Sequence, residues 1–222
     1  MKKLYTINTI NNFMELIYSP FAKPFLEKNP DVEIVNLMDD SLLADTRKLG
    51  GMTPAIARRV MRSALSAQDS GADGILVTCT SVNKATELIK PFLDIPMLNI
   101  EEPVADMAVE NGSKIGILAT LSTSPDAIGR VINRKAEACG KRIELVNSVV
   151  DGAFDILSQG NREKHDEMVR EALYKLEKEV DVIAFAQISM SLIDHRELAV
   201  PVYKIGNSGF ERIRDMMNKG EN

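Results

Sequence analysis

The feature of this sequence that most restricts its fold is an internal repeat with a period of a little over one hundred residues. Similar residues recur at a shift that falls along the chain from 111 to 108 to 105: Thr9 with Thr120, residues 32–36 with 143–147, Asp73 with Asp181, Ser81 with Ser189, and Pro96 with Pro201. Surface loops tolerate the short deletions that this drift requires. We therefore predict two similar lobes, each just large enough to hold its own core. One lobe covers residues 1–98, with a C-terminal helix at 207–222 packed on it, and the other covers 99–206.

Each half of the sequence alternates short apolar runs with longer amphipathic segments. The predicted strands cover 4–9, 32–36, 75–78, 96–100, 115–120, 143–147, 182–186 and 200–205. The predicted helices cover 13–28 with interruptions at two prolines, 54–70, 81–93, 103–111, 124–140, 163–178, a segment before residue 200, and 208–217. This order is typical of parallel sheets flanked by helices, which bind ligands at the carboxyl ends of their strands. The expected fold class is α/β, with two pseudo-symmetric lobes and an active site in the cleft between them.

The apolar run at residues 71–81 stops abruptly on Cys79, which is flanked by hydroxyl side chains. Such a run is typical of a buried parallel strand, and Thr80 or Ser81 can cap a following helix. A thiol at the start of a helix meets unpaired backbone N–H groups and the positive end of the helix dipole, which favour the thiolate and bind carboxylates. The alternative is that Cys79 is a small buried hydrophobic residue, the commoner role of a single cysteine at a strand end.

The composition argues against several classes of function. The net charge is −5, and Lys and Arg are scattered among acidic residues, so no nucleic-acid partner is expected. No apolar run is long enough to span a bilayer and no signal-type core follows the N-terminus, so we expect a cytoplasmic protein without a membrane partner. The two cysteines give neither a disulfide framework nor a zinc-type spacing, and no glycine loop of the phosphate-binding type is present.

Two short segments, together with the repeat, carry a resemblance to a known family. Residues 74–81 read Gly-Ile-Leu-Val-Thr-Cys-Thr-Ser, and residues 114–120 read Lys-Ile-Gly-Ile-Leu-Ala-Thr, with Thr123 after them. In order and spacing they resemble the aspartate/glutamate/hydantoin racemase superfamily, over nearly the whole chain. The resemblance implies a homodimeric enzyme without a cofactor, in which one cysteine per lobe flanks the α-carbon of a carboxylate substrate. One thiolate removes the α-proton, and the other thiol returns a proton from the opposite face.

The resemblance also implies roles for particular residues. Cys79 matches the cysteine of the first lobe and is the expected catalytic residue. Hydroxyl and amide groups at the strand ends are expected to hold the substrate carboxylate: Asn8, Thr9, Thr80, Ser81, Thr120 and Thr123. For Gln187 and Ser189, which the repeat places at corresponding positions of the second half, ligand binding and helix capping are equally good alternatives.

The sequence departs from the family pattern at the position of the second cysteine, where it has Gln187. A glutamine side chain can orient a carboxylate or a carbonyl group but cannot act as an acid or a base. Three functions therefore stay open. The first is a racemase-like isomerase that acts on aspartate, glutamate or a related derivative, with Cys79 as thiolate base or proton donor. The second is a one-cysteine decarboxylase or cis–trans isomerase, and the third is a non-catalytic carboxylate-binding protein.

The other chemically active residues are assigned structural roles. Asp73 and Asp181 precede predicted strands and are expected in turns or caps. His165 lies in a strongly charged predicted helix and His195 in the next one, so both are expected at the surface. Cys139 lies at the end of a predicted helix, away from the strand ends, and is not expected to replace the second cysteine.

Overall fold

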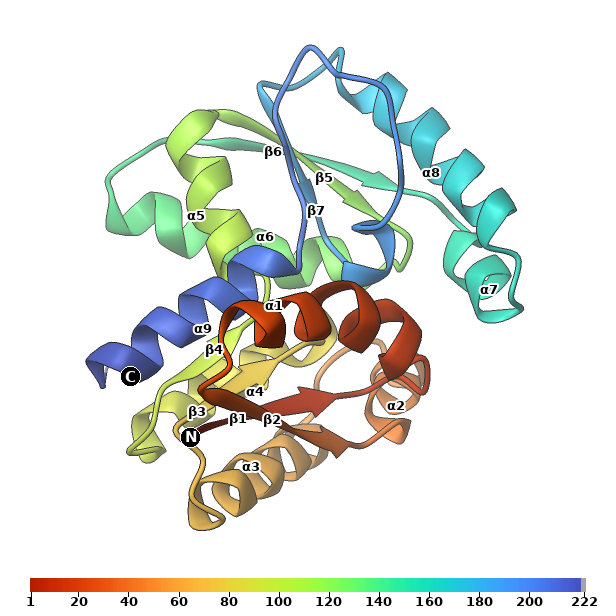
Figure 1. Cartoon of the computed structure of the whole chain (residues 1–222). Helices are drawn as coiled ribbons and strands as arrows, with labels where there is room; N and C mark the ends of the chain where they lie inside the picture. Colours follow the sequence, from red (N-terminus) through yellow and green to blue (C-terminus); the bar gives the residue numbers. More distant parts are fainter. Residues whose placement is uncertain (221–222) are drawn as a thin grey trace. The chain divides into compact units, whose positions relative to one another are not determined.

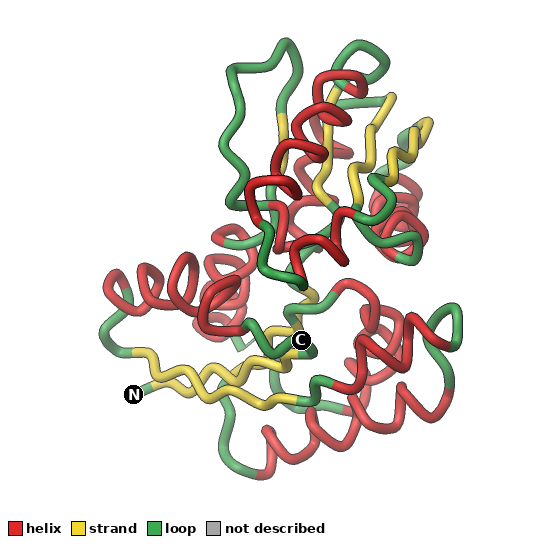
Figure 2. The backbone as a smooth tube through the Cα atoms, turned by 90° about the vertical axis from the view of Figure 1, so that its right-hand side faces the viewer, coloured by secondary structure: helices red, strands yellow, loops and turns green. Residues whose placement is uncertain are grey.

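The structure, a computed structural model, describes residues 1–220 and divides into two compact units. Unit 1 comprises Met1–Ile100 and the segment that begins at Gly206, and unit 2 comprises Glu101–Ile205. Each unit contains one four-stranded parallel sheet with helices on both faces, as Figure 1 and Figure 2 show. The α/β fold class predicted from the sequence is confirmed.

The sheet of unit 1 has the strand order β2-β1-β3-β4. Its strands are β1 (Lys2–Asn8), β2 (Val32–Met38), β3 (Gly74–Val77) and β4 (Met97–Asn99). One face is covered by α2 (Ser41–Lys48), α3 (Pro54–Asp69) and α4 (Asn83–Ile89). The other face is covered by η1 (Met14–Ala22), α1 (Lys23–Lys28) and α9 (Asn207–Lys219). Ile75 and Val77 of β3 belong to the core under α3, whereas Gly74 faces α9, as the alternation of a strand requires.

The sheet of unit 2 has the equivalent order β6-β5-β7-β8. Its strands are β5 (Lys114–Ala119), β6 (Glu144–Val149), β7 (Val182–Phe185) and β8 (Val202–Tyr203). On one face, α7 (Ala153–Ser158) and α8 (Arg162–Leu176) form a core with Leu118, Ile183 and Phe185. On the other face lie α5 (Glu102–Asn111) and α6 (Ser124–Ala138).

The registers of the two sheets confirm the internal repeat residue by residue. Corresponding Cα partners are Leu4 with Ile34 and Ile115 with Leu145, then Leu4 with Gly74 and Ile115 with Val182, then Ile75 with Met97 and Ile183 with Val202. These pairs are related by the shifts of 111, 108 and 105 found in the sequence. Because a slip of one residue would turn every side chain to the opposite face, the two sheets bury equivalent positions.

Several predicted helix boundaries are confirmed by the capping geometry. The hydroxyl of Thr53 accepts a hydrogen bond from the backbone N–H of Ile56 at 3.3 Å, and Pro54 opens α3. Gly71 and Gly140 follow the ends of α3 and α6 with φ values of +79° and +69°. Glycine reaches this left-handed conformation without the strain that a side chain would cause.

Two predicted caps are wrong. Thr80 and Ser81 form a 3₁₀ turn, η2 (Thr80–Val82), and the residue that precedes α4 is Val82, which has no capping side chain. The sequence also predicts Ser208 as the cap of the last helix, but α9 begins at Asn207, so Ser208 lies inside its first turn and buries its hydroxyl without a hydrogen-bond partner. An N-cap side chain has to stand just outside the first turn, and these three side chains do not.

The helix expected before residue 200 is not formed in the described chain. Residues 188–190 form a 3₁₀ turn and residues 193–198 are irregular. Side-chain contacts stabilise this segment in place of the backbone hydrogen bonds of a helix. Lys204 donates to the carbonyl oxygen of Ile193 at 2.8 Å, and Arg196 pairs with the Glu177 carboxylate. His195 is therefore not helical. It is half-buried, and its Nδ1 lies 2.8 Å from the carbonyl oxygen of Arg196.

The expectation that His165 is solvated is also wrong. Its side chain is fully buried, and Nδ1 lies 2.7 Å from the carboxylate of Asp166. The apolar side of α8 carries Val169 and Leu173, and a spacing of four residues puts His165 on that same side. Because most residues around His165 are charged, this spacing is hard to recognise in the sequence. The short helices α2 and α7 were likewise not predicted.

The turn role predicted for Asp73 and Asp181 is confirmed. Asp73 accepts a hydrogen bond from the backbone N–H of Lys3 at 2.7 Å, where β1 begins. Asp181 accepts from the N–H groups of Lys114 at 2.8 Å and Ser113 at 2.9 Å, where β5 begins. These backbone hydrogen bonds hold the pKa of the Asp181 carboxyl below its usual value. The repeat therefore extends to the polar contacts at the amino ends of the strands.

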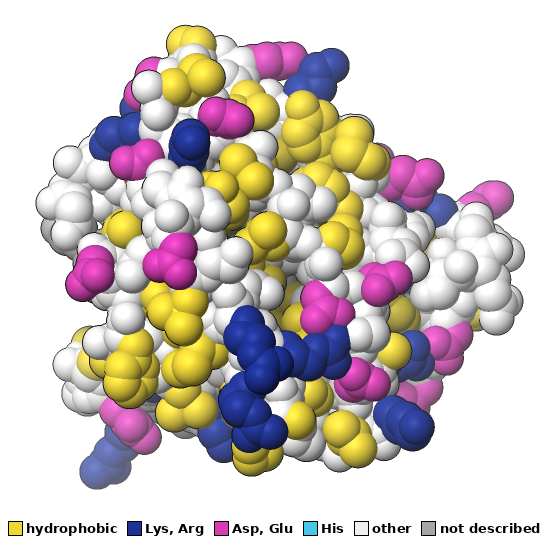
Figure 3. Space-filling model, turned by 90° about the horizontal axis from the view of Figure 1, so that it is seen from below, with side chains coloured by type: hydrophobic (Ala, Val, Ile, Leu, Met, Phe, Trp, Pro, Cys, Tyr) yellow, Lys and Arg dark blue, Asp and Glu magenta, His cyan; other side chains and the backbone are white. Residues whose placement is uncertain are grey.

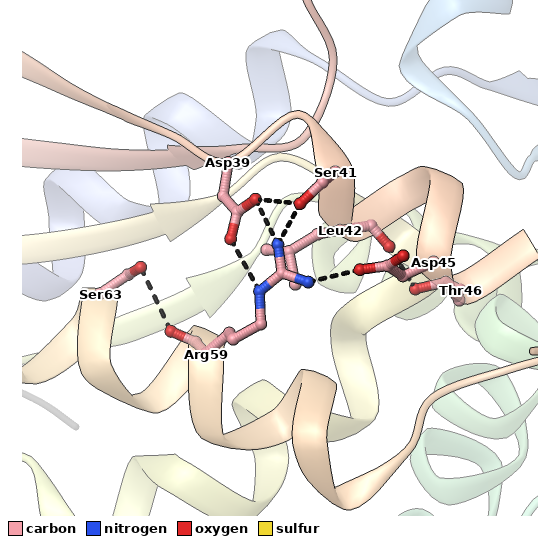
Figure 4. A network of polar contacts seen from close by, with 7 residues as sticks. All are labelled: Asp39, Ser41, Leu42, Asp45, Thr46, Arg59 and Ser63. Carbon is pink, nitrogen blue, oxygen red and sulfur yellow. Dashed lines mark hydrogen bonds and ion pairs between the residues drawn. The ribbon is translucent and has the colours of Figure 1, made fainter.

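A polar network joins α3 to the end of β2 and to α2 (Figure 4). The guanidinium of Arg59 donates to Asp39 at 3.0 Å and to Asp45 at 2.6 Å, and it also donates to Ser41. Burial favours a raised pKa at Asp39, but the hydrogen bonds from Arg59 and Ser41 outweigh it and lower that pKa. The N–H of Asp39 donates to the carbonyl oxygen of Asn8 at 3.0 Å, so the network reaches the end of β1.

The surface carries charges of both signs. The exposed side of α3 presents Arg58 and Arg62. Figure 3 shows a face on which basic side chains gather in one band, with acidic and apolar side chains on either side of it. Among the helices of residues 1–220, none is long and apolar enough to cross a membrane.

Replacing Gly209 by Ala should destabilise unit 1 by about 1–3 kcal/mol. A Cβ at this position of α9 would lie 2.6 Å from a side-chain carbon of Ile100 and 2.9 Å from its backbone oxygen, which has no room to move. Gly129→Ala in α6 is the matched control, because its Cβ would meet only ordinary contacts at 3.4 Å and 3.6 Å and helix propensity would rise. Thermal and urea unfolding should show a loss for Gly209→Ala and no loss for Gly129→Ala. Equal losses would contradict the close approach of α9 to Ile100.

Candidate functional site

The carboxyl edge of the unit 1 sheet collects the polar residues that follow β1 and β3. Asn8 is the last residue of β1 and Thr9 follows it, while Thr78 and Cys79 directly follow β3. Because β1 and β3 are parallel neighbours, these residues end at the same edge. Asn8, Thr9 and Cys79 therefore stand at the carboxyl ends of two neighbouring strands of unit 1.

The side chain of Asn8 is the centre of a buried hydrogen-bond network. Its Nδ2 donates to the hydroxyl of Thr6 at 3.0 Å and also to Oδ1 of Asn36. Its Oδ1 accepts from the hydroxyl of Thr78, which lies 3.2 Å from the carbonyl oxygen of Ile7 as well. Both amide protons of Asn8 are thus used inside unit 1, and the side chain locks the ends of three neighbouring strands.

Thr9 differs from Asn8, although both are buried. Its Oγ1 is enclosed and has no hydrogen-bond partner, at a residue exposure of 2%. A buried hydroxyl without a partner costs free energy that a ligand acceptor could recover. Thr9 therefore carries a buried hydroxyl that no group among residues 1–220 uses.

Cys79 has an extended backbone, with φ −119° and ψ 113°, and its residue is half-buried. The next residues turn sharply, since the N–H of Val82 donates to the carbonyl oxygen of Cys79 at 3.4 Å. Thr80 and Ser81 are buried in this turn, against which α2 packs. Cys79 is thus partly exposed, and its side chain packs against the core on the α3 side of the sheet.

The carboxyl edge of the unit 2 sheet is built around Gln187, which follows β7. Oε1 of Gln187 accepts hydrogen bonds from the N–H of Thr120 at 2.6 Å, from the N–H of Leu121 at 3.2 Å and from the hydroxyl of Thr120 at 3.2 Å. The side chain makes no capping hydrogen bond to η4 (Ile188–Met190), the turn that it precedes. Of the two roles considered for Gln187, capping is therefore wrong.

The other hydroxyls expected in unit 2 also make no cap. Thr123 stands before α6 without a capping hydrogen bond, and its buried Oγ1 has no partner. Ser189 lies in η4 with a buried Oγ that likewise has no partner. Cys139 is exposed at the end of α6, and its Sγ lies 3.3 Å from the carbonyl oxygen of Ala136, within the same helix.

Sequence reasoning missed the participation of Thr6, Asn36 and Thr78. A signal was present for Thr6 and Asn8, because residues two apart on a strand share one face. Asn36 is the Cα partner of Thr6 in the neighbouring strand, which only the register reveals. No cluster of three His, Cys, Asp or Glu side chains among residues 1–220 is placed to hold a metal ion.

Comparisons to known proteins agree with this fold. A model of the Asp/Glu/Hydantoin racemase family matches residues 27–212, and the chain therefore belongs to this family. A Yersinia pestis protein assigned as an Asp/Glu racemase has a TM-score of 0.71 at 20% identity, covering 98% of this chain and 100% of that chain.

Two further solved structures have similar folds. An aspartate racemase homologue from Pyrococcus horikoshii has a TM-score of 0.69 at 15% identity, with 98% of this chain and 100% of that chain covered. Allantoin racemase from Klebsiella pneumoniae has a TM-score of 0.66 at 16% identity, with 100% of this chain and 89% of that chain covered. At such identities the likeness shows the fold alone. The search of curated proteins found no significant match.

The two hydroxyls of the unit 1 edge should respond oppositely to the same isosteric change. Thr78→Val leaves Oδ1 of buried Asn8 without this donor and should cost about 1–3 kcal/mol of stability. Thr9→Val removes a buried hydroxyl that has no partner and should cost less than about 0.5 kcal/mol or stabilise slightly. Urea unfolding of both variants measures the difference. A loss for Thr9→Val as large as that for Thr78→Val would contradict the assignment of Thr9 as a buried hydroxyl without a partner.

Proposed function

We propose that this protein is a cofactor-independent enzyme that acts at the α-carbon of a small carboxylate, such as aspartate, glutamate or a related amino-acid derivative. Cys79 is its thiolate base or proton donor. The observation that carries the proposal is the position of Cys79, a half-buried thiol directly after a central strand in a chain of the racemase family. We expect backbone N–H groups at this strand end to favour the thiolate form, as they do at helix N-termini.

The chemistry requires more than a base. A proton on the carbon next to a carboxylate is far less acidic than a thiol, so its removal leaves an enolate-like charge that preorganised donors must stabilise. The enclosed hydroxyl of Thr9 is such a donor, since nothing inside the protein uses it. Thr80 and Ser81 are further hydroxyl-bearing residues next to the thiol. We propose these three side chains as ligands of the substrate carboxylate.

The properties of Gln187 favour a second candidate reaction, in which only one thiol takes part. Gln187 does not titrate, and its oxygen already accepts three hydrogen bonds inside unit 2. In decarboxylation, the bond to the leaving carboxylate breaks, its electron pair stays on the α-carbon, and the thiol of Cys79 supplies the proton. Solvent then reprotonates the thiolate. A one-cysteine cis–trans isomerase, in which the thiolate adds to an activated double bond and leaves again, fits the same residues.

Deuterium uptake at the α-carbon in D₂O tests the proposal across a panel of aspartate, glutamate, hydantoins and malonates. The wild-type protein should exchange or decarboxylate at least one of them, and Cys79→Ala should lower the rate by about 10²–10⁴-fold, as expected for loss of an acid–base group. Cys139→Ala is the matched control, because it removes the other thiol, which lies at the exposed end of α6. Its rate should equal that of the wild type.

The stereochemical result separates the reactions. Exchange without inversion, or loss of CO₂ from a malonate, supports one-sided chemistry at Cys79. Inversion of the α-carbon requires a second acid in addition to Cys79, and Gln187 cannot be that acid. If no acid on the panel reacts, or if Cys79→Ala reacts as fast as the wild type, the proposal of proton transfer or decarboxylation at the α-carbon is wrong. Binding of the same acids without reaction would then identify a carboxylate-binding protein.

A further inference from the structure

The hydrogen bonds of Gln187 put a side-chain oxygen where an anion could bind. The N–H groups of Thr120 and Leu121 and the hydroxyl of Thr120, which we call the unit 2 nest, all converge on Oε1 of Gln187. Successive backbone N–H groups that converge on one point form a concavity suited to an anionic oxygen. Here a neutral amide oxygen from the same chain fills it.

The repeat identifies the counterpart in unit 1, which is not filled in the same way. The shift of 111 relates Thr120 and Leu121 to Thr9 and Ile10, and the shift of 108 relates Gln187 to Cys79. We call the N–H groups of Thr9 and Ile10 and the hydroxyl of Thr9 the unit 1 nest. The hydroxyl of Thr120 donates to Gln187, whereas the equivalent hydroxyl of Thr9 is buried without a partner.

We propose that Gln187 is a built-in occupant of the unit 2 nest, which excludes carboxylates there and leaves the unit 1 nest as the carboxylate site. The ligand class, a small carboxylate, rests on the proposed function, whereas the occupation of the unit 2 nest does not. Gln187 thereby leaves unit 2 with the donor Nε2 in place of the nest. Nε2 makes no hydrogen bond with residues 1–220, so it can donate to a carbonyl or carboxylate oxygen of the ligand.

The tether explains why an acid in solution would not displace Gln187. An oxygen held on the same chain binds without the loss of translational freedom that a separate acetate ion must undergo. Its three donors also lie at the end of a buried strand, where water has little access to compete. Removing the side chain should therefore create an anion site, and keeping an acceptor oxygen should not.

Amide NMR during titration with sodium acetate tests this with three proteins: the wild type, Gln187→Ala and Gln187→Glu. In the wild type, the amide signals of Thr9 and Ile10 should shift saturably, while those of Thr120 and Leu121 stay unchanged. In Gln187→Ala, the signals of Thr120 and Leu121 should shift as well. In Gln187→Glu, the carboxylate keeps the acceptor oxygen, so the unit 2 nest should again give no response.

A response of Thr120 and Leu121 in the wild type, or no response in folded Gln187→Ala, overturns the proposal. Silence of Thr9 and Ile10 in the wild type overturns the unit 1 half of it. If Gln187→Ala does not fold, hydrogen exchange of the wild type decides: the Thr120 amide should exchange at least about 10-fold more slowly than that of Thr9, and equal rates overturn the proposal. These readouts need no turnover, so a failure of the proposed function would appear only in the deuterium experiment.

Discussion

Parallel pairing of the first and third strands of each repeat is the constraint on which the rest of this structure depends. It brings two strand ends, about 70 residues apart in the sequence, to one edge of a buried sheet, where polar groups must find partners. In unit 1, the hydroxyl of Thr78 donates a hydrogen bond to the side chain of Asn8. In unit 2, the backbone N–H groups of Thr120 and Leu121 donate to the side chain of Gln187. The two units thus have the same backbone fold, but different side chains form the hydrogen bonds at their equivalent strand ends.

This difference gives the two units different chemical capacities. In unit 1, the chain that follows β1 and β3 carries a half-buried thiol on Cys79 and a hydroxyl on Thr9 that has no hydrogen-bond partner in the described chain. In unit 2, the equivalent donors are used by a side chain that cannot titrate. A symmetric fold therefore carries an asymmetric set of reactive groups, which is why we favour chemistry at one thiol over exchange between two.

Much of the fold could be predicted from the sequence, because it depends on patterns that are local or repeated. The shifts of the repeat predicted which strands of the two halves correspond, and the helix predicted from residue 54 begins there, with Thr53 as its cap. The burial of His165 could also have been predicted from its spacing to Val169 and Leu173. The charged composition of that helix predicts an exposed histidine, whereas its periodicity predicts the buried one that the structure has.

The site was less predictable, because its contacts cross between strands. Gln187 accepts from Thr120, 67 residues away, and whether its oxygen reaches a backbone N–H depends on fractions of an ångström. The 3₁₀ turn at Thr80 and Ser81 was equally hard to predict. A hydroxyl after a strand fits a helix cap or a tight turn equally well, and only the packing of α2 distinguishes the two.

The central claim is that the strand end activates Cys79. The most direct measurement is the rate at which iodoacetamide alkylates Cys79 and Cys139 in the same wild-type protein at neutral pH, followed by peptide mass spectrometry. Cys139 is exposed and Cys79 is half-buried, so access alone would make Cys139 the faster thiol. We predict that Cys79 reacts about 10-fold faster, because only thiolate formation can outweigh its lower access. An equal or slower rate at Cys79 would contradict the account.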